Sequence, residues 1–318
     1  MILVTGATGF IGTHLVARLA ALGRSVRCLV RRTVALPDGV EAVYADLAAG
    51  SSLDDALRGV NTVIHLAGVT KALSAADYYK GNARATENLL RALQGRPVRL
   101  VHVSSLAAIG PSPDGAPVPE DAEPHPLTNY GRSKLEAEVL VRRLFPQAVI
   151  VRPPVVYGPR DTDVFQLLKS ISKGLVLEIS GGERWFSAIY VADLVEGLLT
   201  AAESPQSPGR AYFLANSKPA SWTELSATAA RIMGRTPQVL KVSPGMAKAV
   251  AFCAELWARA TRTPGIVSRE KIAEAQCMCW TCDTSRAAAE LGFQARTSLE
   301  SGLALTLAWY KEAGWIGY

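Results

Sequence analysis

Hydrophobic runs alternate with amphipathic stretches through the first half of the chain. Short runs rich in Val, Ile and Leu predict strands at 1–5, 25–30, 41–44, 61–66, 98–104 and 147–152. Apolar residues spaced by three and four positions predict helices near 10–23, 51–58, 77–94 and 129–144. Strands that are apolar along their whole length are covered on both faces. The pattern therefore predicts an α/β fold with a doubly wound parallel sheet of the Rossmann kind.

After Arg152 the pattern becomes less regular, because prolines and glycines interrupt shorter elements. We place a dinucleotide-binding domain at 1–165 and a smaller substrate-binding lobe mainly at 166–318. Residues 186–215 are expected to return to the first domain, so the two lobes are interleaved. In this second half we predict a short strand at 211–215 and helices at 193–202, 221–234 and 246–260.

Composition narrows the class of protein. The chain has 318 residues, of which 49% are hydrophobic and 19% charged, so it can bury a large core. The net charge is +6, but the basic residues are scattered, and we expect no nucleic-acid partner. The first residues lack the features of a signal peptide, and no uninterrupted apolar run is long enough to span a membrane. We therefore expect a cytoplasmic protein.

Three of the five cysteines lie close together, at Cys277, Cys279 and Cys282. A structural zinc site usually needs four ligands, and no histidine follows this group. We therefore predict reduced thiols buried beside a strand, and no metal.

A glycine-rich turn connects the first strand to the first helix, with Gly6, Gly9 and Gly12 at intervals of three. In such turns one glycine permits the tight bend, one lets the backbone approach a phosphate and one lets the helix pack on the strand. A plain tight turn without a ligand is the alternative, but the strand before and the helix after favour a dinucleotide site. The predicted contacts are Gly6, Thr8, Gly9, Phe10, Ile11 and Gly12.

The ends of the second and third strands bear on the choice of cofactor. An acidic residue after the second strand would accept a hydrogen bond from the adenosine 2′-hydroxyl, but this chain has Arg31 and Arg32. Guanidinium groups suit a 2′-phosphate, which favours NADP(H) over NAD(H), unless both arginines are simply solvated. Asp46 and Leu47 follow the third strand; they contact the adenine, or Asp46 caps the next helix.

The candidate catalytic residues are Ser105, Tyr130 and Lys134. A four-residue spacing places Tyr130 and Lys134 on one face of the helix 129–144. The phenol pKa, ordinarily near 10, must fall by about three units for it to act as a base at neutral pH, and we assign this effect to the Lys134 cation. Ser105 ends a parallel strand, at the edge where ligands bind. We predict that Tyr130 exchanges a proton with the substrate and Ser105 holds the substrate oxygen. Tyr130 and Lys134 are also expected to contact the cofactor, Lys134 through the ribose.

Taken in order, these motifs resemble the extended short-chain dehydrogenase/reductase family, of the NAD-dependent epimerase/dehydratase type, over nearly the whole chain. Further matches are His65-Leu66-Ala67-Gly68, Asn82, Ser104-Ser105, the segment 152–160 and the segment 190–194. The resemblance implies that Asn82 supports the active site, although His65 and Asn82 are equally explained as satisfied core polar groups. It implies a homodimer through the helices 77–94 and 129–144. It also implies further cofactor contacts at Leu66, Ala67, Gly68, Pro153, Val155 and Val156.

Departures from the family pattern bear on the substrate. Relatives that act on nucleotide sugars usually have Asn at the position of Val155, and often have a diphosphate-binding Arg at that of Phe186. Without such donors a buried site favours an uncharged, apolar substrate, unless Arg160, Lys169 or Arg184 compensates. Leu106-Ala107 replaces the acidic pair of the dehydratases, so dehydration is not expected. With Arg152-Pro153-Pro154, the chain looks similar to the 3β-hydroxysteroid dehydrogenase-like branch.

The first hypothesis for function is therefore an NAD(P)(H)-dependent oxidoreductase that interconverts a secondary alcohol and a ketone on a sterol-like or isoprenoid molecule. The alternatives are a nucleotide-sugar 4-epimerase that retains NAD and a catalytically silent NADP(H)-binding scaffold. The apolar segment 246–260 is either an amphipathic lid that makes transient contact with a membrane surface or a core-facing helix of the second lobe.

Overall fold

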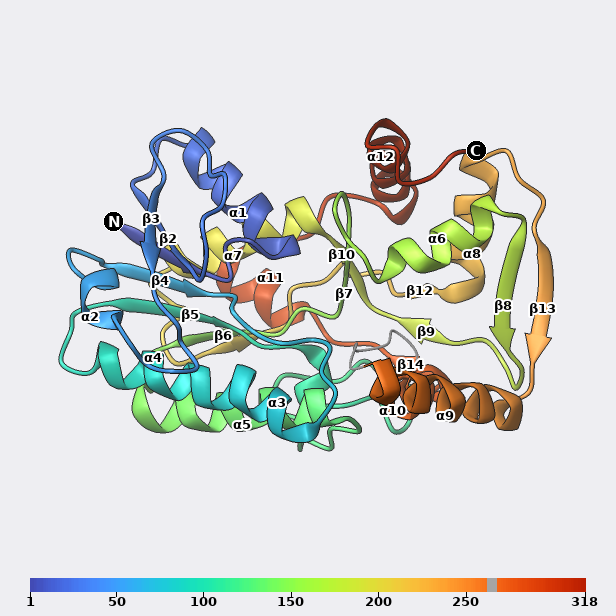
Figure 1. The fold of residues 1–318 in the computed structure, drawn as a ribbon, viewed down its shortest axis with the longest axis horizontal. Coiled ribbons are helices and arrows are strands. Elements are labelled where there is room, and N and C mark those ends of the chain that lie inside the picture. The colour runs from blue at the N-terminus through green and yellow to red at the C-terminus, as the bar shows by residue number, and fades with distance from the viewer. Residues whose placement is uncertain (262–267) are drawn as a thin grey trace.

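The protein, described here from a computed structural model that covers residues 1–261 and 268–318, forms two lobes side by side (Figure 1). The first lobe is built on a seven-stranded sheet in the order β11-β6-β5-β4-β1-β2-β3, and every neighbouring pair is parallel. This order confirms the predicted doubly wound sheet. The strands are β1 (Ile2–Thr5), β2 (Val26–Val30), β3 (Glu41–Tyr44), β4 (Thr62–His65), β5 (Arg99–Val103), β6 (Val149–Val151) and β11 (Ala211–Tyr212).

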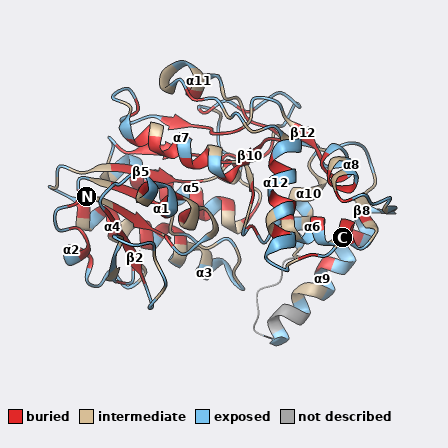
Figure 2. Cartoon of the chain, turned by 90° about the horizontal axis from the view of Figure 1, so that it is seen from above, coloured by how far each residue is buried: buried red, intermediate tan, exposed pale blue. Residues whose placement is uncertain are grey.

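Helices cover both faces of this sheet, because successive residues of each strand point to opposite sides. Val4 and Val101 face a core shared with α1 (Phe10–Ala21) and α7 (Val191–Glu203). Leu3 and Leu100 face a second core, shared with α4 (Ala85–Leu93) and α5 (Asn129–Leu144). Buried residues accordingly concentrate in the strands and on the inner sides of the helices (Figure 2).

The helix predicted at 77–94 is more complex than its sequence pattern. It consists of α3 (Ala75–Tyr79), a π-helical turn (Lys80–Arg84) and α4. The wider turn brings Gly81 against Val69, so close that a Cβ on this glycine would lie 2.3 Å from Val69 Cγ2. The helix thus packs closely on the loop that follows β4.

Two other predicted elements are shorter than expected. The helix predicted at 51–58 is a single turn, α2 (Leu53–Ala56), bounded by Gly50 and Gly59, both of which have positive φ. The strand predicted at 211–215 pairs only as β11. Its partner β6 is followed closely by Pro153 and Pro154, which have no N–H to continue the ladder.

The second lobe contains three small sheets. β7 (Val155–Tyr157) pairs with β10 (Ala188–Tyr190), and β8 (Leu175–Ile179) pairs with β13 (Gln238–Val242), both in parallel. β9 (Trp185–Phe186) lies between β12 (Ala220–Ser221) and β14 (Cys279–Trp280). The helices are α6 (Val164–Ser172), α8 (Trp222–Ile232), α9 (Pro244–Thr261), α10 (Arg269–Gln276), α11 (Ser285–Leu291) and α12 (Leu299–Glu312).

The two lobes exchange segments. α7 packs on the large sheet and β11 forms its edge, while Ala287 of α11 also lies in the first core. The second lobe has its own core around Leu168, Leu225 and Leu307. Within the described residues, no helix is both long enough and apolar enough to cross a membrane.

The cysteine cluster differs in part from its prediction. All five thiols are free, and Cys282 is buried as expected, but Cys277 and Cys279 are only half-buried. Cys279 lies in β14 at the edge of the sheet β12-β9-β14, and its carbonyl oxygen accepts from Ser112 N at 2.9 Å.

Candidate active site

The glycine-rich turn is packed so closely that side chains cannot replace two of its glycines. Gly6 has a φ of +71°, and a Cβ there would lie 2.7 Å from the backbone nitrogen of Ala67. A Cβ on Gly12 would lie 2.1 Å from the carbonyl oxygen of Gly6. Gly9 is the N-cap of α1 and has no side chain with which to cap it. The first-turn N–H groups are therefore left to an anion, as a dinucleotide pyrophosphate requires.

The loop after β4 lies against this turn and is fixed by Asn82. Asn82 Oδ1 accepts a hydrogen bond from Val69 N at 2.7 Å, and its Nδ2 donates to Val69 O at 3.0 Å and to Ser133 Oγ at 2.8 Å. This buried amide thus joins the loop 66–69 to the residue before Lys134. Asn82 is a satisfied core group that also positions two parts of the site.

His65 is explained by the core alone. Its ring nitrogens lie 2.7 Å from Thr5 Oγ1 and 2.9 Å from Thr86 Oγ1. Burial lowers the pKa of His65 to about 3, so the ring is neutral. The sequence left its role open, and these contacts show a satisfied polar group between two strands and a helix.

The predicted adenosine contacts lie beyond the ends of β2 and β3. Arg31 and Arg32 are exposed, and neither forms an ion pair with any residue in the described part of the chain. Asp46 Oδ1 accepts from Ala48 N at 2.9 Å, whereas the N-cap of α2 is Ser52. Asp46 therefore shapes its own turn and does not cap the next helix.

Ser105, Tyr130 and Lys134 come together at the carboxyl end of β5. Ser105 Oγ accepts from Ala107 N at 3.2 Å and is hydrogen-bonded to the Tyr130 phenol. Tyr130 is the second residue of α5, which begins after its N-cap Thr128. Lys134, one turn later, is only 4% exposed, and its Nζ donates to Val103 O at 2.7 Å.

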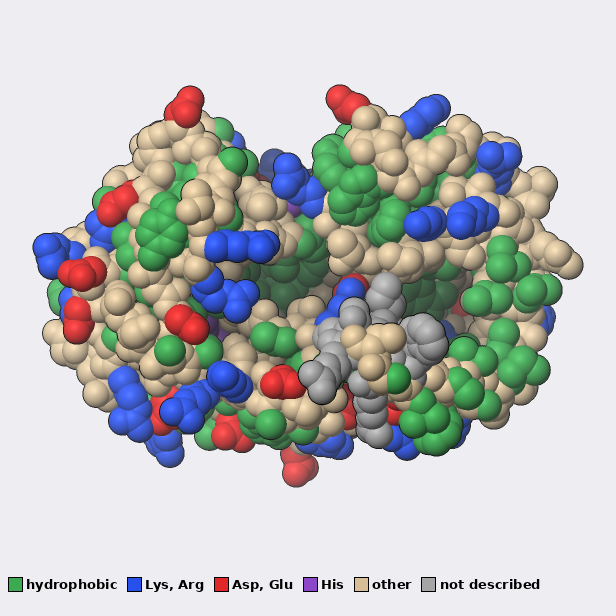
Figure 3. Space-filling view, viewed as in Figure 1, with side chains coloured by type: hydrophobic (Ala, Val, Ile, Leu, Met, Phe, Trp, Pro, Cys, Tyr) green, Lys and Arg blue, Asp and Glu red, His purple; other side chains and the backbone are tan. Residues whose placement is uncertain are grey.

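The segment after β6 adjoins this group. Pro153 O accepts from Leu106 N at 3.0 Å, next to Ser105. Val155 and Val156 continue from it into β7 and are half-buried. The sequence-predicted residues around the glycine turn, the β4 loop and the catalytic group thus all border the carboxyl edge of the large sheet, where Figure 3 shows a hollow between the lobes.

The charges around the phenol differ from the prediction. Burial raises the pKa of Tyr130, while the hydrogen bond with Ser105 lowers it. The charge of Lys271 of α10 lowers this pKa, a contribution that the sequence did not predict. Burial lowers the pKa of Lys134 itself to about 8, against the opposing charge of Glu138. The Lys134 ammonium donates a hydrogen bond to the Val103 carbonyl.

Most of the side chains considered for binding a sugar diphosphate contact other parts of the protein. Phe186 is 1% exposed and stacks on Trp222 with ring centroids 4.2 Å apart. Arg184 donates to the carbonyl oxygens of Ile179, Ser180 and Gly182. Lys169 lies over the ring of Phe165. Arg160 is exposed and is the one compensating cation of the three for which no such contact is seen within the described residues.

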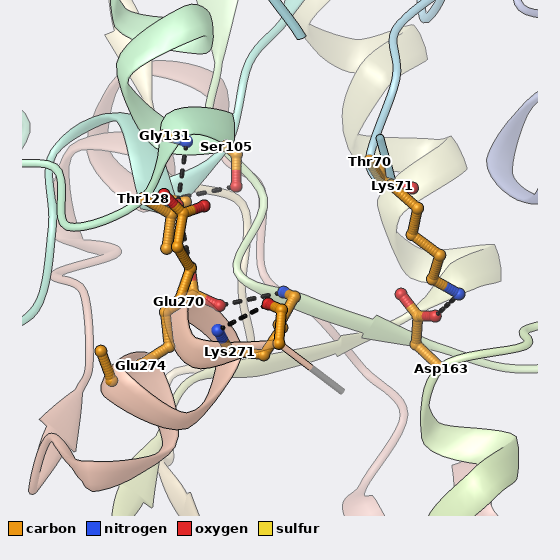
Figure 4. Close-up of polar contacts among 12 residues, drawn as sticks. Thr70, Lys71, Ser105, Thr128, Gly131, Asp163, Glu270, Lys271 and Glu274 are labelled. Atoms are coloured by element: carbon orange, nitrogen blue, oxygen red, sulfur yellow. Dashed lines mark hydrogen bonds and ion pairs between the residues drawn. The ribbon is translucent and has the colours of Figure 1, made fainter. Parts of the chain in front are cut away.

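Sequence reasoning missed α10, which lies against the start of α5 (Figure 4). Glu270 and Glu274 accept hydrogen bonds from Asn129 and Thr128, directly before Tyr130. These residues lie on a short polar helix far along the chain from Tyr130, and no local spacing connects them with it.

A parallel sheet with a glycine turn after β1 and a Ser-Tyr-Lys group at the end of β5, two strands away, defines a dinucleotide-dependent enzyme of the short-chain dehydrogenase type. Comparison with known families agrees. The model of the NAD dependent epimerase/dehydratase family matches residues 2–215, and the chain belongs to this family. It is thus an enzyme of the extended short-chain dehydrogenase/reductase type, as its motifs predicted.

Similar proteins include reductases and sugar-nucleotide enzymes. The chain is 32% identical to a ceramide reductase of Caulobacter vibrioides, covering 99% of this chain and 96% of that one. It is 30% identical to a 4-hydroxy-2-methyl-3-oxo-4-farnesyl-3,4-dihydroquinoline-1-oxide ketoreductase of Stigmatella aurantiaca, covering 94% and 93%. A solved structure of MoeE5 in complex with UDP-glucose and NAD is 27% identical with a TM-score of 0.80, covering 98% of this chain and 99% of that one.

Proposed function

We propose that this protein is an NADP(H)-dependent oxidoreductase that interconverts a secondary alcohol and a ketone on an apolar, sterol-like, isoprenoid or similar lipid substrate. The observation that carries the proposal is the grouping of Ser105, Tyr130 and Lys134 beside the glycine turn. Two relatives that align over almost their full length are named as reductases of molecules with long apolar chains. The apolar Phe186 and the engaged Arg184 support the same substrate class.

The residues present fit a dinucleotide. Gly6, Gly9 and Gly12 would receive the pyrophosphate, the segment 66–68 would lie along the cofactor, and the segment 153–156 would flank the nicotinamide. When bound, the nicotinamide supplies or accepts the hydride. Arg31 and Arg32, which have no acidic partner in the described chain, support a 2′-phosphate and hence NADP(H).

The proton chemistry follows from the positions of three side chains. Ser105 Oγ and the Tyr130 phenol are hydrogen-bonded to each other and would both donate to a ketone oxygen placed between them. Because burial raises the pKa of Tyr130, the phenol holds its proton at neutral pH and begins as the acid. This favours reduction of a ketone as the direction for which the site is prepared. Lys134 would hold the ribose near Val103.

Turnover with candidate substrates tests the proposal. We expect NADPH consumption at 340 nm with 3-ketosteroids or long-chain ketolipids, and none with UDP-glucose. Tyr130→Phe should lower kcat by about 100-fold or more while NADPH affinity stays unchanged. Full activity of this variant would overturn the assignment of Tyr130.

The same assay separates the alternatives. A 4-epimerase would convert UDP-glucose with no net absorbance change at 340 nm, and the MoeE5 complex with UDP-glucose keeps this alternative open for the fold. A silent scaffold would bind NADPH and turn over none of these compounds. The hydrogen bonds of Arg184 to backbone carbonyls disfavour the 4-epimerase. The intact Ser-Tyr-Lys group disfavours the silent scaffold.

The proposal also includes contact with a second copy of the chain and with a membrane surface. A homodimer would use the outer faces of α4 and α5, where Val139 is 54% exposed. A transient contact with a membrane surface would use α9. This helix packs on the lobe through the buried Ala247 and Ala251, while Met246 and Val250 are exposed.

A further inference from the structure

Helix α10 of the second lobe is fixed to the first turn of the catalytic helix (Figure 4). Both carboxylate oxygens of Glu270 lie 3.1 Å from Asn129 N, and Glu270 Oε1 accepts from Asn129 Nδ2 at 2.7 Å. Glu274 Oε1 accepts from Thr128 Oγ1 at 3.2 Å. Thr128 and Asn129 directly precede Tyr130, so α10 lies beside the start of the helix that carries Tyr130.

Lys271 lies between these two carboxylates along α10. Its Nζ donates to Glu274 Oε2 at 2.9 Å, so one carboxylate contacts both this ammonium and the cap of α5. The Lys271 side chain is nevertheless 51% exposed, which leaves it open to an incoming molecule. Lys134, by contrast, is buried and donates to a backbone carbonyl.

We infer that Lys271 is a cation that stabilises the Tyr130 phenolate, and that Glu274 is the positioning residue that holds its ammonium. This inference rests on the proposed role of Tyr130 as the acid. In reduction, the ketone carbon receives hydride from NADPH, the Tyr130 O–H bond breaks and its proton goes to the substrate oxygen. The electron pair stays on the phenolate oxygen, where the charge of Lys271 offsets it.

Titratable and polar groups from five elements lie around Tyr130. Tyr78 of α3 lies with its ring 6.3 Å from that of Tyr130, and Ser105 follows β5. Lys134 lies on α5 itself, and Asp163 precedes α6 and is paired with Lys71. The remaining charges are Glu270, Lys271 and Glu274 of α10.

Their signs differ. Lys271 lowers the pKa of Tyr130, whereas Glu274 and Asp163 raise it. The coupling is mutual: burial acts to lower the pKa of Lys271, but Glu274 and then Tyr130 raise it, and the net shift is upward. Removal of one charge on α10 should therefore move the phenol pKa in a direction that depends on its sign.

The test uses two variants of opposite sign on one helix. In Lys271→Met, the phenol pKa should rise by about half a pH unit or more, because the cation is lost. In Glu274→Gln it should fall, because the amide keeps a hydrogen-bond acceptor for Lys271 without the negative charge. Lys271→Arg should restore the wild-type value. Lys248→Met, on the neighbouring α9, is the matched control and should cause no shift.

The readout is the titration of Tyr130 in the full-length protein with NADP⁺ bound, followed by NMR of ¹³Cζ-labelled tyrosine and assigned with Tyr130→Phe. The pH profile of kcat/KM should shift in the same directions. Equal phenol titrations in wild type, Lys271→Met and Glu274→Gln would overturn the inference. If no ketone is reduced, the proposed function fails, but the titration still decides whether Lys271 acts on the phenol.

Discussion

At the residue scale, the proposed preference for NADP(H) depends on Arg31 and Arg32. Both follow β2 and neither is paired with a carboxylate within the described residues. An unpaired guanidinium on the rim of a dinucleotide site gains from a 2′-phosphate without first giving up another partner. The preference should therefore reside in these two side chains alone.

We expect Arg31→Ala/Arg32→Ala to weaken NADPH binding by about tenfold or more, since a hydrogen bond to a charged group contributes about 1.5–3 kcal/mol. NADH binding should change little, because its ribose has no 2′-phosphate. Calorimetric titration with both dinucleotides measures the ratio. Arg24→Ala, which removes an exposed arginine paired with Glu203 on the same lobe, is the control. An equal loss for both dinucleotides would contradict the assignment.

Residues that belong to a local motif could be predicted from sequence, and residues brought in by the fold could not. Gly6 and Gly12 were identified by spacing because the close packing of one turn requires both. Tyr130 and Lys134 were identified because one helix carries both. Lys271 has no such local signature, since its relation to Tyr130 exists only when α10 packs on α5. The charge effect was therefore expected from the nearest lysine in the helix.

At the scale of elements, α5 is held to the sheet by a buried ion pair. Arg152 follows β6 and meets Glu138 of α5 through two hydrogen bonds, of 2.9 and 2.6 Å. Arg152 Nη1 also donates to Glu120 O at 2.7 Å, and both charged side chains are almost fully buried. This pairing keeps α5, and with it the proposed catalytic residues at its start, in register with the sheet.

Glu138→Ala should lower the free energy of unfolding by about 3–5 kcal/mol, because it leaves a buried guanidinium without its counter-charge. The double variant Glu138→Leu/Arg152→Met should recover most of this loss, since no buried charge remains. Denaturant unfolding measures both. Glu196→Ala, which breaks the exposed pair with Arg18, should cost less than about 1 kcal/mol. Similar losses for Glu138→Ala and Glu196→Ala would show that burial does not matter here.

The same scale shows why the first lobe could be predicted and much of the second could not. α5 has a long apolar period and a Thr128 cap, and its predicted range agrees with the structure. β9 and β12 have two residues each and pair across more than thirty positions, so neither carries a period of its own. β8 and β13 pair in parallel between distant segments. These strands form because of tertiary packing, so the local pattern of hydrophobic and polar residues does not predict them.

At the scale of the whole molecule, large hydrophobic side chains are exposed together on one part of the second lobe. They lie on β8, β13 and α9, and Figure 3 shows hydrophobic groups gathered over these elements at its right and lower right. The members of this apolar face are Leu177, Val239, Leu240, Met246, Val250, Phe252 and Leu256. Three exposed lysines, Lys173, Lys241 and Lys248, lie in or beside the same elements.

This combination of apolar and basic groups suits the surface of an anionic bilayer, where apolar side chains enter the interface and lysines meet lipid head groups. A lipid substrate would be reached from the same surface. We therefore predict that the protein binds vesicles of anionic phospholipid more strongly than vesicles of neutral phospholipid, with binding that weakens as salt increases. Co-sedimentation with both kinds of vesicle measures this.

Two variants separate the apolar from the charged contribution. Leu240→Ser/Val250→Ser should weaken binding to both kinds of vesicle by about tenfold or more, because each side chain loses apolar burial. Lys241→Gln/Lys248→Gln should weaken binding only to anionic vesicles, by about 1 kcal/mol per lysine. Leu305→Ser removes an equally exposed leucine from α12 and should have no effect. If Leu240→Ser/Val250→Ser instead abolishes self-association of the protein and leaves vesicle binding unchanged, the apolar face contacts a second copy of the chain and the membrane proposal is wrong.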